Sequence, residues 1–175
     1  MSEKILRACL ATALSVALAQ AAQADSFKAR VVSVVDGDTI NVVGLGGGPG
    51  APREKVILYG IDCPEPTQDF GAQAKQFTDQ ACFRKEVTVD VKSKDSHGRL
   101  VATIVLADGS NLNEALLANG LAWWSDKFAP NEFLLKQMHE SARTAHKGLW
   151  SAPNPVPPWV FRNGDKNVQA EIKTK

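Results

Sequence analysis

Three acidic side chains, which offer only oxygen atoms as metal ligands, are the first candidates for a functional role. Asp38 follows a tight turn between two β-rich segments, Asp62 ends an apolar run, and Glu65 comes three residues later. No histidine or thiolate accompanies them at ligand spacing, and hard oxygen donors suit calcium or magnesium rather than zinc. The alternative is that Asp36 and Asp38 only form a turn and that Glu65 is solvated.

Strands and helices must position these carboxylates. The β-branched and apolar segments predict five strands, over residues 27–35, 39–43, 56–61, 87–91 and 100–106. The amphipathic segments predict three helices, over residues 71–83, 111–119 and 131–147, with Asn111 and Asn131 as N-caps of the last two. Glycine-rich residues 44–52 predict a loop. The carboxylates therefore lie at the first hairpin turn and at the end of the third strand.

The first residues have the features of a secretory signal peptide. Lys4 and Arg7 precede an apolar run, and Ala22-Gln23-Ala24 matches a cleavage pattern. The alternative is a membrane anchor, but the run is shorter than the roughly 20 residues that a spanning helix needs. We expect residues 1–24 to be removed and the protein to be secreted or periplasmic, with no membrane attachment afterwards. Residues 25–162 then form the domain, including a proline-rich docking segment, and residues 163–175 a flexible tail.

The composition of the chain limits the classes of protein to which it can belong. The 175-residue chain is 44% hydrophobic and carries a net charge of +1, which excludes a disordered chain and allows one ordinary core. Bulk charge does not attract nucleic acid here, so a nucleic-acid partner must be held by a local patch.

Four short motifs give the chain a specific resemblance. Their order and approximate spacing are those of the staphylococcal nuclease (thermonuclease) family, which the chain resembles over roughly residues 27–151. The motifs are Val35-Asp36-Gly37-Asp38-Thr39, Gly60-Ile61-Asp62-Cys63-Pro64-Glu65, Asp95-Ser96-His97-Gly98-Arg99 and Asn113-Glu114-Ala115-Leu116. The resemblance implies an α+β fold, namely a five-stranded OB-fold β-barrel with three packed helices. It also implies a monomeric, calcium-dependent endonuclease acting on single-stranded DNA or RNA.

The resemblance also implies roles for individual residues. The carboxylates of Asp38 and Asp62 and the backbone carbonyl of Cys63 would hold Ca²⁺. Glu65 would act on the attacking water, and Arg99 would donate to the phosphate as a planar fork.

One family position departs from the pattern. The family has a second active-site arginine five residues before the strand-end aspartate, and this chain has Ile57 there. Lys55, on the same face of the strand, is a candidate replacement, against the alternative of a solvated lysine. The departure motivates a second hypothesis: a catalytically weak OB-fold module that binds nucleic acid or protein.

Further residues carry weaker signals. His97 and Phe128 are candidate substrate contacts, although an exposed turn histidine explains His97 equally well. The oxidising compartment expected for an exported protein permits a disulfide between Cys63 and Cys82. The alternative is two separate buried thiols.

Overall fold

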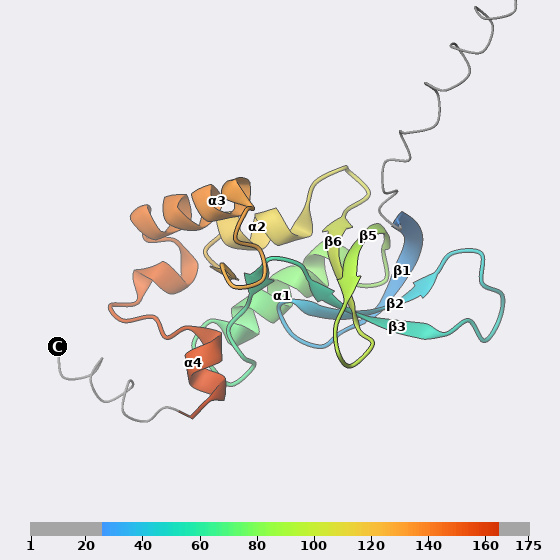
Figure 1. Cartoon of the computed structure of the whole chain (residues 1–175), viewed down its shortest axis with the longest axis horizontal. Coiled ribbons are helices and arrows are strands. Elements are labelled where there is room, and N and C mark those ends of the chain that lie inside the picture. Colours follow the sequence, from blue (N-terminus) through green and yellow to red (C-terminus); the bar gives the residue numbers. More distant parts are fainter. Residues whose placement is uncertain (1–25, 165–175) are drawn as a thin grey trace, which may run out of the picture.

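A closed five-stranded barrel forms the body of the protein (Figure 1). The computed structural model describes residues 26–164, so the expected signal peptide and the last eleven residues lie outside the described part of the chain. Around the barrel the strands follow the order β1 (Ser26–Val34), β2 (Thr39–Gly44), β3 (Arg53–Leu58), β6 (Leu100–Val105) and β5 (Glu86–Lys94). The predicted five-stranded OB-type barrel is thereby confirmed.

A small second sheet extends beyond the barrel. Its strands are β4 (Ile61–Asp62) and β7 (Trp123–Trp124), which pair so that Asp62 lies opposite Trp123. The expected third strand therefore divides at Tyr59 and Gly60, which form a turn between β3 and β4. This break places Asp62 in the small sheet rather than in the barrel.

In the described part of the chain, four α-helices and one 3-10 helix accompany the strands. They are α1 (Gly71–Cys82), α2 (Leu112–Ala118), α3 (Phe133–Thr144), the 3-10 helix Gly148–Ser151, and α4 (Pro158–Arg162). The three predicted helices are present, and α4 is an addition, because five residues are too few to show helical periodicity. Its start is explained by Pro158 in the first turn, where the missing N–H costs nothing. Within residues 26–164, no helix combines the length and the apolar character needed to cross a membrane.

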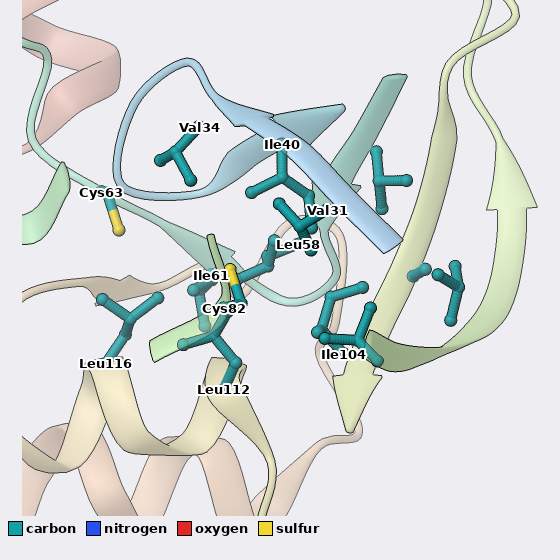
Figure 2. Close-up of a cluster of buried hydrophobic side chains, with 14 of the residues drawn as sticks. Val31, Val34, Ile40, Leu58, Ile61, Cys63, Cys82, Ile104, Leu112 and Leu116 are labelled. Atoms are coloured by element: carbon teal, nitrogen blue, oxygen red, sulfur yellow. The ribbon is translucent and has the colours of Figure 1, made fainter. Parts of the chain in front are cut away.

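The core lies inside the barrel and beneath α2. Alternate strand residues point inward, among them Val31, Ile40 and Leu58, and Leu112 and Leu116 of α2 cover the open end (Figure 2). Each such fully buried side chain stabilises the fold by about 1.5 to 3 kcal/mol. The strand ends that carry the candidate site are therefore fixed to a rigid body.

One predicted helix cap is confirmed and the other is wrong. The side chain of Asn111 accepts hydrogen bonds from the N–H groups of Asn113 and Glu114 at the start of α2. Asn131 does not cap α3, which begins at Phe133 after Glu132 without a side-chain cap.

The predicted disulfide is also wrong. Cys63 and Cys82 are both free, buried thiols, and Figure 2 shows their sulfur atoms apart. The Cys82 thiol donates to the carbonyl oxygen of Thr78 at 3.1 Å, whereas Cys63 packs beside Gly37. Burial raises the pKa of Cys63 well above its ordinary value and that of Cys82 to about 12. Both groups therefore stay protonated, and the thiolate is the form that reacts.

Candidate active site

Asp38 is held between the first hairpin and the end of β4. Its Oδ2 accepts the backbone N–H of Cys63 at 2.6 Å, and its Oδ1 accepts the hydroxyl of Thr39 at 3.1 Å. The neighbouring Gly37 permits this approach, because a Cβ there would lie 2.7 Å from the Cβ of Cys63. The tight turn read from the sequence thus places Asp38 directly against the Asp62-Cys63 segment.

The electrostatic setting of Asp38 is unfavourable for a negative charge. Burial is the main cause that raises the pKa of Asp38 well above its ordinary value, and the neighbouring charges of Asp36 and Asp62 raise it further. The hydrogen bond from Cys63 opposes this effect only in part. A cation placed between Asp38 and Asp62 would relieve both the burial cost and the repulsion.

Asp62 and Glu65 lie together on the segment that leads into α1. The side chain of Asp62 is 17% exposed and that of Glu65 is 30% exposed. Burial raises the pKa of Asp62, and the negative charge of Glu65 adds to this, whereas the hydrogen bonds from Arg162 lower it.

The backbone of Glu65 is fixed by its neighbours. Gln68 accepts the N–H of Glu65 at 3.1 Å and donates its own backbone N–H to the carbonyl oxygen of Glu65 at 2.8 Å. Gly71 lets α1 begin at this point, because a Cβ there would lie 1.8 Å from that same carbonyl oxygen.

Arg162, at the end of α4, is a site residue that the sequence reasoning missed. Its guanidinium donates to both carboxylate oxygens of Asp62, at 3.0 Å and 2.7 Å, and to Oε1 of Glu65 at 2.7 Å. The available signal was the predicted docking of the proline-rich segment, which leads into α4. Neither a local motif nor periodicity indicated that a residue beside the expected tail reaches the carboxylates.

Arg99 lies in a different turn and has a different partner. Its Nε donates to Oδ2 of Asp95 at 2.6 Å, and its side chain is 38% exposed. Within the described residues it makes no recorded hydrogen bond or ion pair with Asp62 or Glu65. The structure therefore places Asp38 against the Asp62-Cys63 segment, joins Asp62 and Glu65 through Arg162, and leaves Arg99 oriented by Asp95.

The weaker candidates lie outside this acidic group. Lys55 is exposed and pairs with Asn41. It lies two residues before Ile57 on β3, and Ile57 pairs with Thr39, next to Asp38. His97 is a 78% exposed side chain in the turn before Arg99. Phe128 is 70% exposed, with the ammonium of Lys127 5.3 Å from the centre of its ring.

The residues present fit a hard cation held by two carboxylates. Asp38 and Asp62 supply oxygen donors in a partly buried setting that disfavours their own charges. Across residues 26–164 no group of three or more histidine, cysteine, aspartate or glutamate side chains is arranged to hold a metal. A calcium ion takes six to eight oxygens, so the Cys63 carbonyl, water and phosphate would have to complete its shell.

Comparison with known proteins gives a consistent result. Residues 55–152 match the family model described as staphylococcal nuclease homologue. An uncharacterized endonuclease of Escherichia coli O157:H7 is 34% identical over 134 residues, covering 77% of this chain and 84% of that protein. A micrococcal nuclease of Shigella flexneri is 33% identical over 151 residues, covering 81% and 84%. Protein ParB of Escherichia coli is 34% identical over 181 residues and covers 97% of each chain.

Proposed function

The chain belongs to the staphylococcal nuclease family, and from this premise we propose that it is a calcium-dependent endonuclease that hydrolyses DNA or RNA. The observation that carries the proposal is the convergence of Asp38, Asp62 and Glu65. The Cys63 N–H joins the first carboxylate to the segment that bears the other two. A domain that only binds nucleic acid has no physical use for three carboxylates, which repel phosphate unless a cation is present.

We assign the residue roles that the family resemblance implies, and the hydrogen bond between Asp38 and Cys63 supports them. Asp38 and Asp62 would hold the calcium ion, which when bound would neutralise a phosphate that must accept a fifth oxygen. Glu65 orients the attacking water and accepts its proton, and the described hydrogen bonds of its side chain engage only Oε1. Arg99, oriented by Asp95, donates to the phosphate oxygens as a planar fork.

A second candidate function is favoured by one observation, the isoleucine at position 57. Ile57 is half-buried on β3 and offers no donor to a developing phosphorane charge. Losing one such donor costs a nuclease about 3 kcal/mol in the transition state. In this alternative the protein is a weakly active module that binds nucleic acid or protein.

The substitution Glu65→Gln separates the two functions. It preserves the size of the side chain and removes its basicity, so we expect hydrolysis of single-stranded DNA in calcium to fall at least about 100-fold. A matched control is Glu114→Gln on α2, which should keep the wild-type rate. If wild type and Glu65→Gln bind single-stranded DNA equally and neither hydrolyses it, the binding module is the correct function.

The remaining aspects of the proposal concern location and assembly. We propose that the protein acts as a monomer, in the periplasm or outside the cell, after removal of residues 1–24. The sequence pattern of those residues supports the export and the cleavage, and the family resemblance is the basis for the monomer. N-terminal sequencing of the exported protein tests it, and a first residue other than Asp25 would contradict the expected cleavage site.

A further inference from the structure

Arg162 makes an ion-pair network with Asp62 and Glu65, two of the three carboxylates that the proposed function needs. One guanidinium nitrogen contacts both Asp62 and Glu65, and the other contacts the second oxygen of Asp62. Paired parallel N–H donors are the geometry that recognises carboxylate and phosphate groups alike. In the described part of the chain, no other cationic side chain is ion-paired with Asp62 or Glu65.

Two further contacts hold α4 in this position. Trp159 of α4 packs edge-on against Trp123, with ring centroids 5.6 Å apart, and Trp123 is the strand partner of Asp62. The side chain of Gln68 donates to the carbonyl oxygen of Val156, just before α4. Figure 1 shows α4 beside the chain that leads into α1. The position of Arg162 is therefore set by packing and hydrogen bonds as well as by its own charge.

The guanidinium is open to a ligand. The side chain of Arg162 is 47% exposed. Part of its guanidinium therefore faces solvent, although it donates to partly buried carboxylates. A cation on Asp62 would compete with the guanidinium for the same oxygens, and like charges repel at that distance. The arginine released from Asp62 would then lie next to the phosphate that the cation attracts.

We propose that Arg162 is a second phosphate-binding arginine of the site, supplied by the C-terminal helix α4. Without substrate it neutralises Asp62 and Glu65, and with substrate its fork binds oxygens of the phosphate under attack. The inference rests on the proposed function for its catalytic consequence, but the binding of phosphate by Arg162 is measurable separately.

The test compares Arg162→Ala and Arg162→Lys with wild type. A matched control is Arg143→Ala, which removes an equally charged, 61% exposed side chain from α3. Affinity for a phosphorothioate-linked single-stranded DNA, whose linkages resist hydrolysis, is measured by fluorescence anisotropy in calcium at several salt concentrations. Values of kcat and KM are measured on ordinary single-stranded DNA, and the melting temperature of each variant confirms folding.

We expect Arg162→Ala to reduce the dependence of log affinity on log salt by about 0.7, the value for one single-strand phosphate contact. It should also lower kcat by about 100-fold, as expected for one lost donor. Arg162→Lys should recover the salt dependence but only part of kcat, because an ammonium lacks the planar fork. Arg143→Ala should leave both quantities at the wild-type values.

Other results would overturn the inference. An unchanged salt dependence in Arg162→Ala shows that the arginine does not bind phosphate. If Arg162→Ala hydrolyses DNA faster than wild type and binds calcium more tightly, then Arg162 only blocks the carboxylates. If wild type does not hydrolyse DNA at all, the proposed function fails, and the salt dependence alone then decides whether Arg162 binds phosphate.

Discussion

The backbone N–H of Cys63 donates to the carboxylate of Asp38 at 2.6 Å across 25 positions of sequence. This bond joins the first hairpin of the barrel to the segment that carries Asp62 and Glu65. Because the carboxylate is buried and lies near two other acidic residues, its pKa is raised well above the ordinary value. The bond thus holds a carboxylate at a place where a cation would stabilise it.

Calcium binding should depend on Asp38 and Asp62. Replacing either by asparagine removes one charged oxygen ligand, so we expect the affinity for calcium in calorimetric titration to fall at least about tenfold. Calcium should raise the melting temperature of wild type by mass action and of the variants much less. Asp79→Asn, on the exposed face of α1, is the control. Equal calcium affinity in wild type and both site variants would contradict the assignment.

Arg99 should contribute to the rate and Asp95 should act by orienting it. Arg99→Ala is expected to lower kcat by about 100-fold, because one charge-assisted donor to the phosphate is lost. Asp95→Asn removes a charged acceptor from Nε of Arg99, so a smaller loss in the same parameter is expected. Steady-state kinetics on single-stranded DNA measures both. If Arg99→Ala keeps the wild-type kcat, Arg99 has no role in the mechanism.

Both cysteines of the described residues should remain thiols after purification without reductant. Denaturing the chain that begins at Asp25 in the presence of an alkylating reagent should add two alkyl groups, because neither thiol is bridged. Under native conditions the reaction should be slow, since burial raises the pKa of both groups. Intact mass spectrometry gives the number of alkyl groups added. An unalkylated protein whose mass is two hydrogens below that of the dithiol would show that the disulfide is present.

His139 should make stability depend on pH. Burial lowers the pKa of this histidine, opposed by the charge of Glu140 and assisted by that of Arg143. The unfolded chain therefore binds the proton more tightly, so the free energy of unfolding should decrease as pH falls below about 6.5 and level off below the folded pKa.

Urea unfolding between pH 5 and 8 measures this dependence. The ring of His139 packs edge-on against Trp150, with centroids 4.9 Å apart, so His139→Phe keeps an aromatic contact and should lose the dependence. His97→Gln, at a 78% exposed position, should keep it. A dependence that persists unchanged in His139→Phe would assign it to another group.

Local sequence patterns predicted the five strands because strand residues alternate between buried and exposed positions, whereas the closed barrel was implied by the family resemblance. They also predicted the α2 cap, since Asn111 bonds within its own turn. Arg162 was not predictable in this way, because it lies 100 positions from Asp62 and no local pattern joins them. The prediction of a disulfide was wrong for a related reason, because the sequence gives no distance between the two thiols. The Asp62-Cys63-Pro64-Glu65 motif predicted which carboxylates meet, but not the guanidinium they hold.

The most direct test of the central claim is hydrolysis of single-stranded DNA by the chain that begins at Asp25. The purified protein is incubated with a labelled oligonucleotide in calcium and in excess chelator, and the products are separated on a denaturing gel. The proposed nuclease yields shortened fragments in calcium and none in chelator, with Glu65→Gln as the inactive control. Intact oligonucleotide in both conditions, from a folded protein that still binds it, would contradict the claim.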